Sequence, residues 1–164
     1  MAGITPPPIV TPRLVLEPVT AAVASAVVAG DLSSLEAAEG WPHDDTLDAM
    51  RMMTEPDAGP GWFITAGGRV IGDCGAFAWP DRSGTVEIGY GLAAPARGRG
   101  YATEAVRALC SWLVTDTGAA VITAVTDADG NRPSRRVLEK IGFAVTAEDD
   151  GQVSYALTAA GITP

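Results

Sequence analysis

A glycine-rich loop between a predicted strand and a predicted helix constrains the fold of this chain more than any other segment. Residues 86–92 alternate as a strand does, and apolar residues after position 101 recur at helical spacing. The loop between them includes Arg97, Gly98, Arg99 and Gly100. Glycines let the backbone approach a ligand closely, and the first helical turn presents unpaired N–H groups and a positive dipole end. With two arginines beside them, these groups predict a pyrophosphate-binding site.

Two common phosphate-binding patterns fail in this loop. A Walker loop ends in Gly-Lys-Ser/Thr, and this loop has no lysine; the dinucleotide fingerprint needs glycine at position 103, where Thr103 stands. The segment matches a different pattern, Gln/Arg-x-x-Gly-x-Gly/Ala, with Arg97, Gly100 and Ala102 in the defining places. This pattern resembles motif A of the GNAT superfamily of acetyl-CoA-dependent N-acetyltransferases.

A second segment, beginning at Asn131, resembles a later GNAT signature. It reads Asn131-x-x-Ser134, followed by a short predicted helix and then Gly142-Phe143. The local physics agrees, because Asn131 is a good N-cap, Pro133 is tolerated in a first turn and Gly142 suits a left-handed C-cap.

The start of the chain extends the resemblance. Residues 11–18 resemble the first strand of the ribosomal-protein N-acetyltransferases and their relatives. The resemblance implies a single α/β (α+β) GNAT-like domain over residues 13–164, with a central mixed, mostly antiparallel sheet of about seven strands flanked by about four helices. Residues 1–12, with three consecutive prolines, are expected to form a short extended arm.

Local patterns predict an alternation of strands and helices. Strands are expected at residues 13–18, 61–66, 69–79, 85–92, 120–126, 143–147 and 153–158. Helices are expected at residues 21–29, 33–39, 45–53, 101–116 and after Asn131. Periodicity alone indicates only a mixed α/β chain, and the finer topology comes from the resemblance.

Charge is distributed unevenly along the chain. With 11 basic and 20 acidic residues the net charge is −9, which argues against nucleic acid as a partner. Six of the basic residues fall in the two segments expected to flank the cofactor: Arg97, Arg99, Arg132, Arg135, Arg136 and Lys140. The acidic remainder favours a cationic acceptor such as an amine.

Several other classes of protein are not expected. A single histidine and no spaced ligands argue against a metal site, and Cys74 and Cys110 are predicted to be reduced thiols in the core. The longest apolar stretch, residues 21–29, is too short to span a bilayer. No secretory signal precedes the predicted domain, so we expect a cytoplasmic protein without a membrane partner.

The resemblance implies acetyl-CoA as acyl donor and direct attack by a primary amine in a ternary complex. The cofactor contacts carried over are Leu92, Arg97, Gly98, Arg99, Gly100, Tyr101, Ala102, Asn131 and Ser134. Leu92, with Gly91 or Ala93 beside it, would face the acetyl group through backbone N–H groups.

Two side chains are candidates for proton transfer. The resemblance makes Glu87 the general base, although an outward-facing strand glutamate is an equal alternative. Many superfamily members carry a tyrosine general acid farther along the second helix, where this chain has Val137-Leu138. In the ribosomal-type branch the serine of the signature takes that place, so Ser134 is expected to hydrogen-bond the CoA sulfur unless it only adds polarity to the first turn. Asn131 can both cap the helix and contact the cofactor.

The acceptor pocket is the least constrained part of the site. The resemblance places it between the first helices and the middle strands, which offer Trp41, His43, Trp79 and Tyr90 as walls. Aromatic walls beside an acidic residue such as Asp44 or Asp73 could hold an ammonium group. The two tryptophans could instead be core or turn anchors, and His43 could be a surface residue or a helix cap rather than a base.

Three functional alternatives stay open. The donor could be another acyl-CoA such as succinyl-CoA, which an added basic residue near the acyl group would favour. The domain could bind CoA without catalysis. The acceptor could be a protein N-terminal amine or a small amine.

A homodimer is also an open possibility. The apolar stretch at 119–122 could belong to a homodimer interface or to a buried strand.

Overall fold

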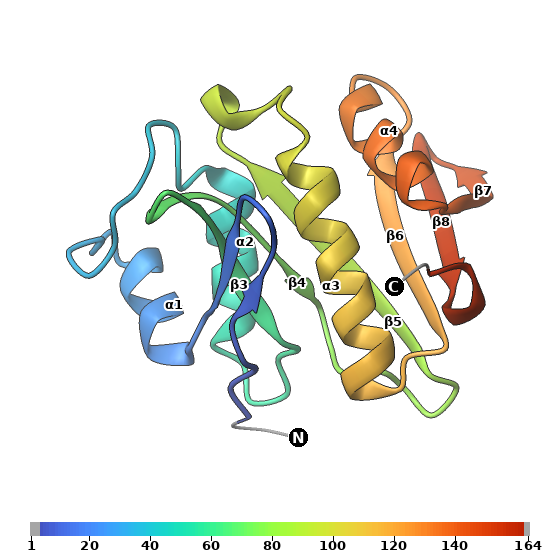
Figure 1. Ribbon diagram of the computed structural model, residues 1–164, viewed down its shortest axis with the longest axis horizontal. Helices are drawn as coiled ribbons and strands as arrows, with labels where there is room; N and C mark the ends of the chain where they lie inside the picture. Colours follow the sequence, from blue (N-terminus) through green and yellow to red (C-terminus); the bar gives the residue numbers. More distant parts are fainter. Residues whose placement is uncertain (1–3, 163–164) are drawn as a thin grey trace.

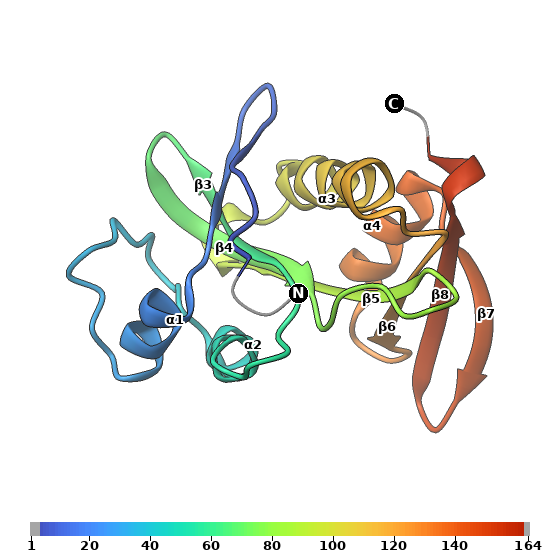
Figure 2. The same ribbon diagram turned by 90° about the horizontal axis from the view of Figure 1, so that it is seen from below.

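One twisted sheet with two helices on each face makes up the computed structural model, which describes residues 4–162 (Figures 1 and 2). The strands are β1 (Ile9–Val10), β2 (Val15–Pro18), β3 (Gly61–Ala66), β4 (Arg69–Ala76), β5 (Thr85–Leu92), β6 (Val121–Asp127), β7 (Ala144–Asp149) and β8 (Gln152–Thr158). The helices are α1 (Ala21–Val28), α2 (Asp44–Met53), α3 (Tyr101–Thr117) and α4 (Arg132–Ile141). The predicted α/β architecture and the mixed, mostly antiparallel sheet are confirmed.

The strands lie in the order β1-β2-β3-β4-β5-β6-β8-β7. Every neighbouring pair is antiparallel except β5 and β6, which are parallel. That pair is short, because only residues 85–87 of β5 are in register with residues 121–123 of β6. Beyond this point the two strands diverge (Figure 1), so the following residues of β5 have no strand partner on that side.

Each face of the sheet carries its own apolar core. The core between the sheet and the helices α3 and α4 includes Trp62, Leu109, Leu113 and Tyr155, all buried. The core between the sheet and the helices α1 and α2 includes Val27, Met50 and Phe63, also buried. Burying one such side chain contributes roughly 1.5–3 kcal/mol.

Alternation along β5 decides which side chains are free for a site. Val86, Ile88 and Leu92 belong to the α3 core, so the intervening Glu87 and Gly91 face the α2 side.

The sheet has eight strands, where about seven were predicted. The additional strand is β1, which lies within the arm expected at residues 1–12 and pairs Ile9 with Leu16 and Val10 with Val15. A two-residue strand has no periodicity to detect, and it exists only because β2 offers it a partner. Residues 1–3 of that arm lie outside the described part of the chain.

The helix predicted at residues 33–39 is wrong. This segment forms turns and an isolated bridge between Ala37 and Val70. The N–H of Val70 donates to the Glu36 carbonyl (2.7 Å), and the N–H of Ala38 donates to the Val70 carbonyl (2.8 Å). These bonds to a distant strand outweigh the weak tendency of seven residues to form an isolated helix. Strand β4 also ends at Ala76, three residues earlier than predicted.

Several local predictions are confirmed. Gly118 and Gly142 end α3 and α4 in the left-handed conformation, and Cys74 and Cys110 are buried and unpaired. Residues 119 and 122 of the apolar stretch are buried inside the domain, so the buried-strand alternative accounts for them. Within residues 4–162, no helix is long and apolar enough to cross a bilayer.

Candidate active site

A cavity of about 370 Å³ opens where β5 and β6 diverge. Its wall is formed by α2, the segment before β3, strands β4, β5 and β6, and the start of α4. Five of the predicted site residues meet in this wall: His43, Glu87, Tyr90, Asn131 and Ser134. The cavity therefore connects the α2 side of the sheet with the α4 side.

The glycine-rich loop has a backbone that only glycine adopts readily. Gly98 and Gly100 have φ of 78° and 80°, and Gly100 is the N-cap of α3 with no side chain to bond the first turn. Among residues 4–162, the N–H groups of Gly98, Arg99 and Gly100 have no hydrogen-bond partner. Arg97 Nε donates to the Leu92 carbonyl (3.2 Å) and ties the loop to the end of β5. Free N–H groups beside arginines fit a pyrophosphate.

The unpaired edge of β5 presents specific N–H groups. The Ala93 N–H donates to the Ile71 carbonyl of β4 (2.8 Å), so it is not available to a thioester. Because N–H groups point alternately to the two edges of a strand, the Gly91 N–H also points toward β4. Those of Leu92 and Tyr90 then point to the edge that β6 has left. Three backbone N–H groups were predicted for the acetyl position, those of Gly91, Leu92 and Ala93. Of these, only the Leu92 N–H points to the unpaired edge of β5.

Ser134 lies in the first turn of α4 and contacts Tyr90 of β5. The Tyr90 Oη lies 2.8 Å from Ser134 Oγ and 3.1 Å from the Ser134 carbonyl oxygen. Burial raises the pKa of Tyr90 to about 12, although the Ser134 contact lowers it in part. The phenol is therefore protonated at neutral pH. When it donates to Ser134 Oγ, the serine's own hydrogen is left for another acceptor.

Asn131 is at the N-cap position of α4, as predicted, but its side chain makes no capping hydrogen bond. Its backbone has φ of −112° and ψ of 42°, outside the extended conformation that a capping side chain uses. The capping role expected from the sequence is thus wrong for the side chain. The Asn131 amide instead lies in the cavity wall.

Glu87 and His43 lie on the α2 side of the cavity. The Glu87 side chain is exposed, and its carboxylate accepts no hydrogen bond from any described residue. His43 is the N-cap of α2, and its ring accepts from the Thr46 N–H at 3.4 Å. A Cβ added at Gly91 would lie 3.1 Å from that ring, so the imidazole covers the bare backbone of β5. His43 is therefore both a helix cap and a cavity residue.

A model of the acetyltransferase (GNAT) domain matches residues 13–144. The chain belongs to the GNAT acetyltransferase family. The uncharacterized N-acetyltransferase YjdG of Bacillus subtilis is 30% identical over an alignment of 112 positions, and the alignment covers 63% of this chain and 66% of that relative. The match thus spans just under two thirds of the relative's length.

Two solved GNAT structures share the fold. One is Mycobacterium smegmatis RimJ in complex with CoA-disulfide, with 23% identity, a TM-score of 0.68, and coverage of 98% of this chain and 90% of the other. The second is the ribosomal-protein-S5-alanine acetyltransferase from Vibrio fischeri, with 14% identity, a TM-score of 0.70, and coverage of 97% and 100%. At these identities the likeness concerns the fold alone. The predicted resemblance to the GNAT superfamily is confirmed.

Neither predicted tryptophan lines the cavity of this GNAT domain. Trp41 is buried in the α1 and α2 core, edge-on to Phe63 at 5.2 Å. Trp79 packs on the opposite face against Trp112 of α3, at 6.3 Å. The sequence could not distinguish a core tryptophan from a pocket tryptophan, because both are apolar and partly buried.

The arginines of α4 are not equivalent. Arg135 Nε donates to the Tyr155 hydroxyl (2.9 Å), and its guanidinium lies 3.9 Å from Glu148. It is engaged within the domain and is not free for a phosphate, whereas Arg132 and Arg136 are exposed.

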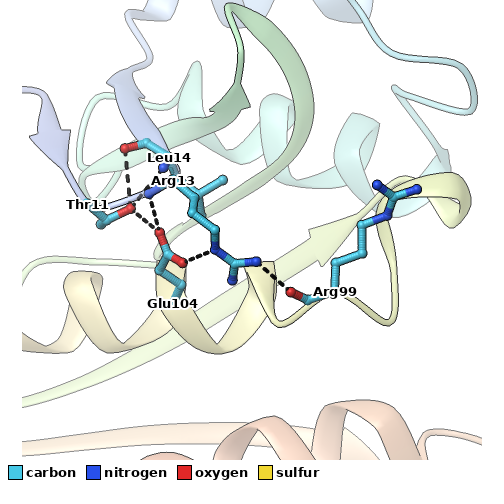
Figure 3. Close-up of polar contacts among 5 residues, drawn as sticks. All are labelled: Thr11, Arg13, Leu14, Arg99 and Glu104. Atoms are coloured by element: carbon cyan, nitrogen blue, oxygen red, sulfur yellow. Dashed lines mark hydrogen bonds and ion pairs between the residues drawn. The ribbon is translucent and has the colours of Figure 1, made fainter.

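Sequence reasoning missed a set of contacts that joins the start of the GNAT domain to the glycine-rich loop (Figure 3). Glu104 of α3 accepts hydrogen bonds from the Thr11 hydroxyl (2.5 Å), the Arg13 N–H (2.9 Å) and Arg13 Nε (2.7 Å). Arg13 also donates to the Arg99 carbonyl (2.8 Å), and its guanidinium lies 4.6 Å from the centre of the Tyr101 ring. We call Thr11, Arg13 and Glu104 the strap.

The strap has an electrostatic signature at Glu104. Burial raises the pKa of this carboxyl, but the hydrogen bonds from Thr11 and Arg13 outweigh it and hold the pKa below its ordinary value. A Thr-x-Arg spacing between β1 and β2 was the available signal, but nothing local links it to a helix about ninety residues later.

Proposed function

We propose that the protein transfers an acetyl group from acetyl-CoA to a primary amine by direct attack within a ternary complex. The observation that supports this most is that Glu87 and Ser134 line the same cavity at the β5–β6 divergence, although they lie on opposite sides of the sheet. A base on the acceptor side and a hydroxyl on the cofactor side are what direct acyl transfer needs.

The residues fit a bound CoA. The free N–H groups at 98–100 and the exposed Arg97 and Arg99 would bind the pyrophosphate. The unpaired edge of β5 would receive the pantetheine amides as a strand partner, and the Leu92 N–H would hydrogen-bond the thioester carbonyl. A CoA thioester supplies an acyl group with a good leaving group. The structure of RimJ with CoA-disulfide supports a CoA-type ligand on this fold.

Glu87 would take the proton from the acceptor's ammonium, directly or through a water. Its exposed carboxylate at the cavity wall is free to do so. The neutral amine then attacks the thioester carbon, the C–S bond breaks, and the sulfur leaves as a thiolate, while the nitrogen releases its remaining extra proton to solvent and so becomes the amide nitrogen.

The Ser134 hydroxyl would donate a hydrogen bond to that sulfur. Tyr90 would keep the serine oriented, because its own hydroxyl stays protonated near neutral pH. A thiolate has an ordinary pKa near 8.5, so a hydrogen bond is sufficient help and a strong acid is not needed.

Acetyl is favoured over succinyl as the transferred group. A succinyl carboxylate would need a cationic partner, and none of the described residues lining the cavity is lysine or arginine. The acceptor can be a small amine or a protein N-terminus, and no residue of the wall discriminates between these by itself.

Thermal unfolding with acetyl-CoA, succinyl-CoA and ATP tests the proposal. Acetyl-CoA at 100 times its Kd should stabilise the fold by about 2.7 kcal/mol, and ATP should not. A panel of primary amines with acetyl-CoA then separates an enzyme from a non-catalytic CoA-binding domain. If acetyl-CoA causes no shift and the denatured protein releases no CoA, the proposal is wrong.

A further inference from the structure

Asp73 is a buried carboxylate that the proposed chemistry does not use. It lies on β4 in the cavity wall and is only 7% exposed. Its Oδ2 accepts hydrogen bonds from the Thr46 hydroxyl (2.7 Å) and from Trp41 Nε1 (3.1 Å). Its Oδ1 accepts none from residues 4–162, and no lysine or arginine in that range forms an ion pair with it. One oxygen is held in place and the other is left unpartnered at the cavity.

This arrangement is unfavourable for the empty fold. Burial raises the pKa of Asp73, an effect that the Thr46 and Trp41 hydrogen bonds and the nearby His43 only partly oppose. An asparagine could accept the same two hydrogen bonds without a buried charge. The carboxylate therefore has no evident role in holding the fold together.

The rest of the acceptor side carries the same sign of charge. Asp45 and Asp48 of α2 and Glu87 of β5 line the cavity together with Asp73. The described lining residues include no lysine or arginine, and His43 is the one group there that can become cationic. The wall is thus built for positive charge.

A single ammonium group is a poor match for this wall. An acceptor amine must lose its proton before it attacks, and surrounding carboxylates favour the protonated form. The conflict disappears if the acceptor has two cationic groups, because one stays charged in the wall while the other is deprotonated and reacts.

Two carboxylates are separated in the way that such an acceptor requires. Asp73 is in register with Gly91, which is four residues beyond Glu87 on the same face of β5. At about 3.3 Å per residue, these positions lie roughly 13 Å apart along the strand. Asp73 and Glu87 therefore address different parts of one bound molecule.

We propose that Asp73 binds a second, non-reacting cationic group of the acceptor, so that the preferred acceptor is a primary amine with another positive charge. The inference rests on the proposed acetyl transfer. In this arrangement the free Oδ1 accepts an N–H of that cation, while Thr46 and Trp41 orient the carboxylate through Oδ2. Asp73 is thus a specificity-determining residue.

The test compares 1,4-diaminobutane with 1-aminobutane as acceptors for acetyl-CoA. The wild type should prefer the diamine by about tenfold or more in kcat/KM, which is the value of one charge-assisted contact. Asp73→Asn should remove most of this preference by raising KM for the diamine, with kcat/KM for the monoamine changed less than about twofold. Equal losses with both amines, or no loss, would overturn the proposal.

Matched variants separate charge from packing. Thr46→Val removes one of the two hydrogen bonds that orient the carboxylate but keeps its charge, so it should reduce the preference for the diamine less than Asp73→Asn does. Asp116→Asn makes the same chemical change on an exposed residue near the end of α3, and should alter nothing. The Asp73→Asn fold is checked by its Tm without ligand, which should be equal to or above that of the wild type, and by an unchanged shift with acetyl-CoA.

Failure of this inference is distinguishable from failure of the proposed function. A wild type that transfers acetyl without preferring the diamine contradicts the inference alone. A wild type that does not bind acetyl-CoA contradicts the proposed function. If neither amine is acetylated, calorimetry of each amine with the CoA-bound protein replaces the rate assay, and equal affinity for the two, or no binding of the diamine, overturns the inference.

Discussion

Ser134 of α4 and Tyr90 of β5 form a polar contact at the cavity, and this contact bears on the leaving group of the proposed reaction. The sequence pattern predicts the serine, because the signature Asn131-x-x-Ser134 is local. It predicts the tyrosine only as a pocket wall, because the contact joins positions 44 residues apart. A phenol with a pKa near 12 acts here as a fixed hydrogen-bond donor and not as an acid.

Removal of these hydroxyls should reveal coupling. Ser134→Ala is expected to lower kcat by about tenfold with little change in acetyl-CoA affinity, the value of one hydrogen bond to a developing charge. Tyr90→Phe should lower kcat less, and the double variant should be no slower than Ser134→Ala, because Tyr90 acts through the serine. The kcat values of the wild type, the two single variants and the double variant together make up a double-mutant cycle, which measures the coupling between the two hydroxyls. Additive losses would mean that Tyr90 has a role of its own.

Among the structural elements, the glycine-rich loop was the easiest to predict, because its defining residues are contiguous. Motif spacing marked Gly100 as essential, and the structure explains why: its φ is 80°, and a Cβ would lie 3.3 Å from an Arg13 guanidinium nitrogen. The strap was not predictable in the same way. It brings together side chains whose separation in sequence is 91–93 residues, and no local pattern carries that information.

The loop offers an internal control for backbone strain. Gly100→Ala and Gly118→Ala both place an alanine at positive φ, which should cost about 1–2 kcal/mol in each case. Only Gly100→Ala should also weaken acetyl-CoA binding, by about tenfold or more, because only Gly100 borders the free N–H groups. Thermal shifts with and without acetyl-CoA measure both effects. Equal binding by the two variants would contradict the assignment of the loop.

The strap should stabilise the fold in a pH-dependent way. The folded-state pKa of Glu104 is lowered, so its contribution is present above the unfolded pKa of about 4.3 and is lost as pH falls through the folded value. Glu104→Gln should therefore lower Tm by about 2–4 °C at pH 7, and the difference should shrink toward pH 3. Glu55→Gln, on an exposed turn, serves as the control. A difference that is constant with pH would rule out the charge as its cause.

At the scale of the whole molecule, the sheet consists of two parts joined by three residue pairs of β5 and β6. The resemblance predicted this general fold, but periodicity could not, since alternation in a strand does not reveal its neighbour. The sequence offered Asp73 as one possible acidic neighbour of the pocket, but it could not show that this side chain is buried, because a carboxylate in a strand usually faces solvent. Only the packing of α2 against the sheet buries it.

The open edge of β5 should close when the cofactor binds. Hydrogen exchange at the Tyr90 and Leu92 amides should slow when acetyl-CoA is added, because these N–H groups gain partners there. The Ala93 amide, which already donates to Ile71, should change little and is the internal reference. Exchange followed residue by residue by NMR measures the effect. An unchanged exchange rate at the Leu92 amide would mean that acetyl-CoA does not contact this edge of β5.

The strap also imposes an order on how the protein is made. Arg13 leaves the ribosome 91 residues before Glu104, to which it bonds. The glycine-rich loop lies just before Glu104 in the sequence. The Arg13 side chain that donates to the Arg99 carbonyl of this loop therefore cannot be held by Glu104 until α3 has been made. A nascent chain that ends before α3 therefore carries β1 and β2 without the hydrogen bonds from Thr11 and Arg13 to Glu104.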